Sequence, residues 1–332
     1  MSTLQAVLLF LGSFVLTVTA STVLSRRIEQ LGKWLLLSES LLGIVAALGA
    51  DAPEISSSIS ALRSGNHDLG LGIVLGSNIF NLAALLGLSA MVANKVHIQT
   101  RALLLNGGVA VGVLGVTIAQ LYGLLPNGWA LGLIALLMVP YVTAMALSPA
   151  SIRRAAQSLG FGRFLGVTVE DSNFEAATGE AARRPSSADI LDVLPTLVCI
   201  VLGSIGLVRS ALVMGGAWKI PNAVLGTIIL ASLTGIPNVI TAVQLARRGR
   251  GSAVLSESLN SNTLNLIVGI SLPTLFFASV PLDAHSMLSL WWLAGMTVLA
   301  LVLSFFMGGL GRKTGLLLIL VYLVFVAIVF LR

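Results

Sequence analysis

Charged residues are scarce in this chain. Asp, Glu, Lys and Arg make up 10% of its 332 residues, whereas hydrophobic residues make up 56%. The mean hydropathy is +0.99. A soluble globular domain carries about 25% charged residues. The shortage of charge therefore excludes an ordinary soluble domain and indicates a chain that crosses a membrane several times.

Cysteine and catalytic motifs are nearly absent too. The single cysteine, Cys199, lies in an apolar run, so the chain can form neither an internal disulfide nor a cysteine-based metal site. It has no G-x-x-x-x-G-K-S/T run to bind nucleotide phosphates and no H-E-x-x-H run to hold a catalytic zinc. We therefore expect no ATP-driven step, no enzymatic activity and no cofactor.

Long apolar runs are what the chain has in abundance. A membrane-spanning helix needs roughly 20 apolar residues. The first run lacks the preceding positive charge of a secretory signal peptide, so we expect it to remain as a span. The fold class that follows is an all-α polytopic membrane protein with ten transmembrane helices. The ten runs lie near residues 4–24, 34–62, 68–94, 101–121, 127–148, 189–209, 219–246, 252–280, 286–309 and 313–331.

The basic residues indicate how these spans are oriented. The net charge is +6, but Lys and Arg sit in short loops between spans, which favours a topology signal over a nucleic-acid surface. With ten spans, fifteen of the nineteen fall on one side, and the four exceptions are Arg63, Arg209, Lys219 and Arg332. Because cytoplasmic loops carry the Lys/Arg excess, we expect both termini outside and the polar loop 149–188 inside. The expected location is the plasma (inner) membrane, with the lipid bilayer as a partner.

The sequence contains a repeat at an offset of 184 residues. Residues 48–65 align without a gap on 232–249, and residues 76–82 align at the same offset on 260–266. One offset that aligns two separated motifs rarely arises by chance. The identical pairs are Pro53 and Pro237, Arg63 and Arg247, Gly65 and Gly249, Ser77 and Ser261, Asn78 and Asn262, Asn81 and Asn265, and Leu82 and Leu266.

This repeat predicts two halves of five spans each. An odd number of spans reverses the second half relative to the first, which is the inverted-topology architecture of many transporters, with the site near the midplane. We therefore divide the chain into a first five-helix repeat, 1–148, a cytoplasmic linker, 149–188, and a second five-helix repeat, 189–332. The repeated motifs cover 49–81 and 233–265.

Two carboxylates lie in the second span, where apolar residues are expected. The stretch GADAPE contains Asp51 and Glu54 beside Pro53. Proline removes a backbone donor and interrupts a helix, so we expect a break with a new half-helix near Glu54. Irregular backbone at this depth occurs only within protein or beside a water-filled cavity. Freed carbonyls and carboxylate oxygens suit a hard cation.

The third span adds two neutral oxygens. Ser77 and Asn81 are four residues apart and therefore share one helical face. Taken alone, such residues more often form hydrogen bonds between membrane helices, and Pro and Gly often only kink a helix. An intramembrane carboxylate, by contrast, is costly and points to function by default. We therefore rank Glu54 first among the cation ligands.

These residues carry a resemblance to a known family. GADAPE followed by GSNIFN resembles the first alpha repeat of the calcium/cation antiporter superfamily, which includes the sodium/calcium exchangers and has the pattern G-S/T-S-x-P-E, then G-S-N-x-x-N/D. The resemblance implies exchange of calcium or a related cation for sodium, potassium or protons, with ions held by broken spans 2 and 7 and by the motifs on spans 3 and 8. The site residues that match are Glu54, Ser77, Asn81, Thr234 and Ser261.

The second repeat departs from the family pattern. Asn238 stands where the family has a glutamate, and Asn265 stands where an acid is frequent. In the first repeat, Asp51 occupies a hydroxyl position. Glu257 lies one turn before Ser261, so the missing charge can be interpreted as relocated to Asp51 and Glu257. The alternative for Glu257 is a charge that extends to the membrane interface or pairs near Arg250. A fourth acid, Glu39, lies early in span 2, where the inner interface is the simpler interpretation for it.

The functional prediction is a secondary active cation antiporter that works by alternating access. Its ligands would be the transported cations, calcium, sodium or protons. One alternative is a non-transporting membrane sensor or scaffold with the same fold, which the loss of Glu at position 238 favours. Another is an antiporter for monovalent cations and protons. A cation flux assay in vesicles separates these possibilities.

Overall fold

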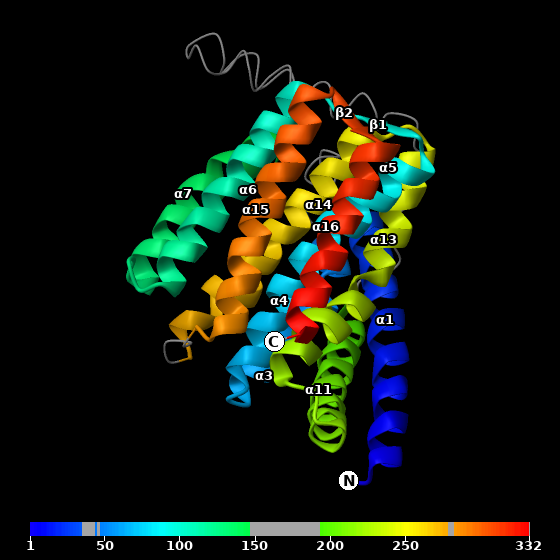
Figure 1. The fold of residues 1–332 in the computed structure, drawn as a ribbon, viewed down its shortest axis with the longest axis vertical. Helices are drawn as coiled ribbons and strands as arrows, with labels where there is room; N and C mark the ends of the chain where they lie inside the picture. Colours follow the sequence, from blue (N-terminus) through cyan, green and yellow to red (C-terminus); the bar gives the residue numbers. More distant parts are fainter. Residues whose placement is uncertain (35–43, 45–46, 147–192, 278–281, 332) are drawn as a thin grey trace.

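The computed structural model describes residues 1–34, 44, 47–146, 193–277 and 282–331. Nearly all of these residues are helical (Figure 1). The first half contains α1 (Thr3–Trp34), α3 (Ala52–Arg63), α4 (His67–Asn81), the π-helix η1 (Leu82–Leu88), α5 (Ser89–Val92), α6 (Thr100–Leu121) and α7 (Asn127–Ala146). The second half contains α11 (Val193–Trp218), α12 (Asn222–Val224), the π-helix η2 (Leu225–Leu230), α13 (Ala231–Arg247), α14 (Gly251–Leu266), the π-helix η3 (Ile267–Ser271), the 3-10 helix η4 (Pro273–Leu275), α15 (Ala284–Phe306) and α16 (Arg312–Leu331).

Eight helical stretches among the described residues are long and apolar enough to cross a membrane. They correspond to eight of the ten expected spans, so the chain is a multi-pass membrane protein. The expected span 34–62 lies partly outside the described residues. The expected span 252–280 contains α14, η3 and η4, and α14 is rich in Ser and Asn. The linker 149–188 and Glu39 also lie outside the described residues.

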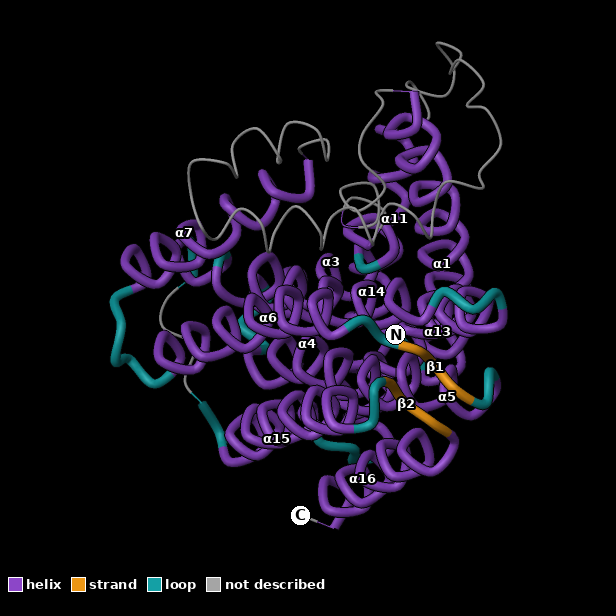
Figure 2. Tube along the Cα trace, turned by 90° about the horizontal axis from the view of Figure 1, so that it is seen from above, coloured by secondary structure: helices purple, strands orange, loops and turns teal. Residues whose placement is uncertain are grey.

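The helices surround a central group of polar segments. Viewed from above, α3, α4 and α14 lie in the middle, while α7 and the α15–α16 pair lie at the periphery (Figure 2). Helices α1 and α11 pack against each other along one edge in both views. A short antiparallel pair, β1 (Lys95–His97) and β2 (Gly309–Gly311), joins the loop after α5 to the loop after α15. The central position of α4 explains why nearly all of its residues are buried.

Glycines allow α4 to lie directly against η2. A Cβ added at Gly76 would overlap with the backbone of Thr227, and one added at Gly226 would meet the carbonyl oxygen of Leu69 at 2.5 Å. Small residues let the backbones of membrane helices come into van der Waals contact. This contact stabilises their packing, because lipid provides no hydrophobic driving force between helices. Gly76, the first residue of GSNIFN, therefore fixes the packing of α4 against the second half of the chain.

The expected break in span 2 occurs at Asp51. Residues 47–50 are helical, Asp51 lies in a bend, and α3 begins at Ala52. Pro53 has no N–H to donate to the carbonyl of Gly49. The hydroxyl of Ser21 on α1 lies instead 3.0 Å from Gly49 O and 3.2 Å from Ala50 O. In this structure the carbonyls beside the break therefore face a hydroxyl donor on α1.

The expected break in span 7 is wrong. Helix α13 continues through Pro237. A proline inside a helix removes one hydrogen bond and kinks the helix without having to end it. The irregular backbone in this span lies earlier instead, in the π-helix η2 that precedes α13. The two halves thus differ, because the break that the resemblance implied for both spans is present at Asp51 and absent at Pro237.

Candidate cation-binding site

Four polar side chains of the first half are fully buried together at the centre. Asp51 lies in the bend that precedes α3, Glu54 in its first turn, and Ser77 and Asn81 one turn apart on α4. Each has 0% of its surface exposed. Proline at the start of α3 holds the two carboxylates at a helix start, where unpaired N–H groups and the helix dipole favour negative charge. The structure therefore brings the best-matched motif residues into one buried region.

Asp51 connects this region to the second half of the chain. Its Oδ1 accepts one hydrogen bond from Asn238 Nδ2 and one from Ser261 Oγ, each at 2.8 Å. Ser261 Oγ in turn accepts from Asn81 Nδ2 at 3.0 Å. Hydrogen bonds thus join Asp51, Asn238, Ser261 and Asn81 across the two halves. We call these four residues, together with buried Glu54, Ser77 and Asn265 of the same segments, the central cluster.

Several oxygens of the central cluster have no hydrogen-bond partner. They are Asp51 Oδ2, Glu54 Oε1 and Oε2, Ser77 Oγ, Asn81 Oδ1, Asn238 Oδ1 and Asn265 Oδ1, and all are buried. Buried polar atoms are nearly always paired, so a group of unpaired ones requires an explanation. Carboxylate, hydroxyl and amide oxygens are the ligands that hard cations take. The set is chemically suited to a cation such as calcium or sodium.

Two of the expected second-half residues are less closely connected. Thr234 is buried, but its hydroxyl donates to the carbonyl of Leu230 in its own helical segment at 2.8 Å. Glu257 is partly exposed as a residue, but its Oε2 is buried and has no hydrogen-bond partner. It is close enough to Asp51 for the two carboxyl groups to interact electrostatically. Within the described part of the chain, no three His, Cys, Asp or Glu side chains form a metal-sized group, so neutral oxygens must complete the ligand set.

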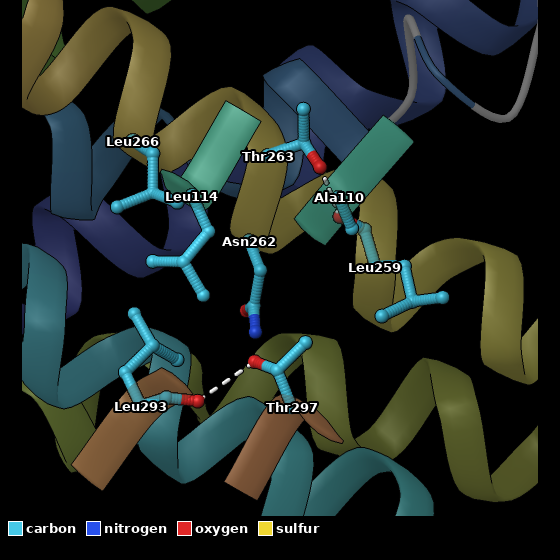
Figure 3. A pocket seen from close by; sticks show the side chains of 8 residues that line it. All are labelled: Ala110, Leu114, Leu259, Asn262, Thr263, Leu266, Leu293 and Thr297. Carbon is cyan, nitrogen blue, oxygen red and sulfur yellow. Dashed lines mark hydrogen bonds between the residues drawn. The ribbon is translucent and has the colours of Figure 1, made fainter. Parts of the chain in front are cut away.

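A small cavity lies beside Asn262, whose Oδ1 accepts a hydrogen bond from Asn81 of the central cluster. Its volume is about 10 Å³, which is the size of one water molecule. Figure 3 shows Asn262 and Thr297 extending toward each other there, with the Thr297 hydroxyl bonded to the carbonyl of Leu293. The lining residues are Ala110, Leu114, Leu259, Asn262, Thr263, Leu266, Leu293 and Thr297. None of the carboxylates lines this cavity, so it is separate from the proposed ligands.

The contact between Asp51 and Asn238 is the feature that sequence reasoning missed. Both residues were noted as departures from the family pattern, but separately, because they lie 187 positions apart in the chain. The sequence contained a hint of this contact, because the first repeat gains an acid at Asp51 and the second lacks one at Asn238. Only the folded chain shows that these two side chains touch.

Comparison with known proteins identifies a family and relatives that this chain resembles. The sequence model of the family described as "Sodium/calcium exchanger protein" matches residues 5–148 and 193–331. "Sodium/calcium exchanger MaX1" of Methanosarcina acetivorans is 25% identical over 353 aligned positions, which cover 99% of each chain. "Uncharacterized membrane protein MJ0091" of Methanocaldococcus jannaschii is 25% identical, over 90% of this chain and 89% of that one.

Solved structures share the fold. The crystal structure of the H⁺/Ca²⁺ exchanger CAX superimposes with a TM-score of 0.70 at 16% identity, over 98% of this chain and 85% of that one. The sodium-calcium exchanger NCX_Mj, soaked with 2.5 mM Na⁺ and 0.1 mM Sr²⁺, superimposes with a TM-score of 0.59 at 20% identity, over 98% of this chain and 99% of that one. At these identities the likeness establishes the fold alone.

Proposed function

This chain belongs to the sodium/calcium exchanger protein family, and on that premise we propose that it is a secondary active antiporter that exchanges calcium or a related cation for sodium or protons by alternating access. The observation that carries the proposal is the central cluster, whose buried oxygens lack hydrogen-bond partners. An occupied site would satisfy these oxygens. The relative named as a sodium/calcium exchanger aligns over 99% of both chains, which agrees with this function.

We assign Glu54 and Asp51 as the charged ligands, with neutral oxygens from the other members of the central cluster. Two carboxylates can compensate one divalent cation, and affinity for such cations follows the number of charged ligands. Thr234 and Glu257 are retained as neighbouring candidates, one for its hydroxyl and one for its charge. The carboxylates of Asp51 and Glu54 also repel each other, so a bound cation or proton between them relieves this repulsion.

The charge missing at Asn238 is supplied by Asp51 in this proposal. Asp51 Oδ1 lies 2.8 Å from the Asn238 amide nitrogen, so a carboxylate oxygen occupies nearly the place where a glutamate at 238 would extend. The family pattern would place one acid in each repeat. Here both acids, Asp51 and Glu54, come from the first repeat, and the second contributes amides and a hydroxyl. Relocation to Asp51 explains the loss at 238 without a loss of function.

Competition for the central cluster couples the two ion movements. A site that binds either one divalent cation or monovalent ions, and that opens alternately to each side, exchanges one for the other. The alternation requires two related conformations, which inverted repeats provide. Reciprocal hydrogen bonds support such a relation here: Asn78 Nδ2 donates to Asn262 O and Asn262 Nδ2 donates to Asn78 O, each at 3.0 Å and at the repeat offset of 184.

We further propose that both termini face the outside of the plasma (inner) membrane and that the linker faces the cytoplasm. The distribution of Lys and Arg supports this orientation. In a chain carrying Cys199→Ala, a cysteine placed at exposed Ser64, in the α3–α4 turn, is expected to react with an impermeant thiol reagent from outside. A cysteine at Arg248, in the α13–α14 turn, is expected to react only after permeabilisation. The reverse result would contradict the orientation.

The function is tested by ion replacement in proteoliposomes. Purified protein is reconstituted, and Ca²⁺ uptake is measured with an outward gradient of Na⁺, of K⁺ or of H⁺, and with no gradient. We expect uptake that depends on Na⁺ or H⁺ and disappears when that gradient is collapsed. Flux of monovalent cations or protons without Ca²⁺ would favour the monovalent antiporter. No flux of any ion would favour the scaffold.

A further inference from the structure

Four buried asparagines connect α4 to α14 across the centre of the molecule. Besides the reciprocal bonds between Asn78 and Asn262, Asn265 Nδ2 donates to Asn78 Oδ1, and Asn81 Nδ2 donates to Asn262 Oδ1, each at 3.2 Å. Under the repeat offset of 184, Asn78 corresponds to Asn262 and Asn81 to Asn265, so the last two bonds are equivalents of each other. The four side chains are between 0% and 5% exposed. We call them the asparagine clasp.

The asparagine clasp gives its members two different roles. The amide nitrogens of Asn78 and Asn262 each donate to a backbone carbonyl of the opposite helix. Their amide oxygens accept hydrogen bonds from Asn265 and Asn81, respectively. The amide nitrogens of Asn81 and Asn265 donate hydrogen bonds within the asparagine clasp, and the amide oxygen of each is buried without a hydrogen-bond partner. A Cβ added at Gly235 would lie 3.7 Å from Asn81 Oδ1, so this oxygen faces α13.

The orientation of an amide decides whether it attracts or repels a cation. The two ends of an Asn amide have nearly the same shape, but one carries two donors and the other carries lone pairs. A turn by 180° would present N–H groups in place of a ligand oxygen. An acceptor that holds the nitrogen therefore determines which end is free.

We propose that Asn78 and Asn262 are positioning residues that hold Asn265 and Asn81 with their amide oxygens toward the transported cation. This inference rests on the proposed antiport function, because it concerns ligands of the same site. Asn78 holds Asn265, and Asn262 holds Asn81. The Asn81 nitrogen has two acceptors, because it also donates to Ser261 Oγ at 3.0 Å. Among the described residues, the Asn265 nitrogen donates to Asn78 Oδ1 alone. Loss of Asn78 should therefore have the larger effect.

A double-mutant cycle between positions 78 and 265 tests the proposal. Asn78→Leu removes the acceptor, and Asn265→Asp provides a ligand with an oxygen at both ends, which needs no orientation. The dissociation constant of Ca²⁺ is measured on purified protein by equilibrium binding. We expect Asn78→Leu to weaken binding about tenfold or more in the wild-type background and less than about twofold in the Asn265→Asp background. The cycle cancels the affinity that the added charge of Asn265→Asp brings by itself.

The controls separate orientation from helix packing. Thr263→Val, next to Asn262 on α14, removes a buried hydroxyl that donates to the carbonyl of Leu259 in its own helix, and it should leave Ca²⁺ binding unchanged. If Asn78→Leu fails to reach the membrane, Asn78→Ala takes its place in the cycle. An equal loss from the position-78 change in both backgrounds would show a role in packing alone and overturn the proposal. A wild-type protein that binds neither Ca²⁺ nor Na⁺ would contradict the proposed function itself.

Discussion

The two carboxylates beside the helix break have different surroundings. Asp51 Oδ1 is held by two donors on α13 and α14, whereas both oxygens of Glu54 have no hydrogen-bond partner. Asp51 is therefore fixed in place and links the halves of the chain, while Glu54 is free to coordinate. The motif match predicted Glu54, Ser77 and Asn81 as cation ligands; the structure buries all three side chains, and their role as ligands stays a prediction. It could not predict the partner of Asp51, because contacts between distant residues depend on how α3 and α13 pack.

The proposed relocation of charge to Asp51 leads to the first residue prediction. Asp51→Asn removes the acid, and Asn238→Glu in the wild-type chain places two carboxylates against each other, so each single change should lower Ca²⁺-dependent flux about tenfold or more. The double change Asp51→Asn with Asn238→Glu restores one acid at the same place from the other helix. We expect it to recover flux above either single variant, measured in proteoliposomes at matched protein content. A double variant with no more flux than the poorer single variant would contradict the relocation.

Glu257 allows a second residue prediction. It interacts electrostatically with Asp51 and its Oε2 is buried, but it has no described hydrogen bond to the central cluster. We therefore expect Glu257→Gln to raise the half-saturating Ca²⁺ concentration severalfold while maximal flux is largely kept, because a nearby charge attracts the cation without coordinating it. Initial rates over a range of Ca²⁺ concentrations measure both quantities. Complete loss of flux would instead make Glu257 a direct ligand, and unchanged kinetics would make it a bystander.

Hydropathy and turn residues predicted most of the helical elements but not their irregularities. Spans 1, 3 to 7, 9 and 10 follow directly from apolar runs of sufficient length. The π-helices were not predictable, because one extra residue in a turn leaves no mark on composition. Two of them begin close after the asparagine clasp: η1 at Leu82, directly after Asn81, and η3 at Ile267, two positions after Asn265. Such π-segments occur often at functional sites, and here they follow the residues Asn81 and Asn265 in both halves.

The close packing of α4 against η2 provides a prediction at the scale of elements. Gly76→Ala would force a methyl group into the backbone of Thr227, so the two segments must separate. Overpacking of this kind destabilises a structure by about 1–3 kcal/mol. We expect a lower temperature of unfolding, measured as the loss of monodisperse protein after heating, and reduced flux. Gly108→Ala on α6, where an added Cβ meets nothing within 4 Å, is the matched control and should behave as the wild type.

At the scale of the whole molecule, helices from both halves enclose one buried polar cluster. The residues of the central cluster come from both halves of the sequence, and Asn78 of α4 and Asn262 of α14 meet at the repeat offset. The sequence predicted the repeat from identities at 184 residues, but the meeting of its two copies depends on the fold. This arrangement agrees with an exchanger in which the two halves move around a shared site.

The most direct test of this account is ion exchange by Glu54→Gln. This change keeps the size of the side chain and removes the charge from a carboxylate whose two oxygens are both buried without a hydrogen-bond partner. Asp68→Asn, which neutralises a partly exposed acid at the start of α4, is the matched control. In proteoliposomes at equal protein content, Glu54→Gln should reduce Ca²⁺ exchange to the level of protein-free liposomes, while Asp68→Asn should exchange as the wild type does. Exchange by Glu54→Gln at the wild-type rate would contradict the assignment of the site.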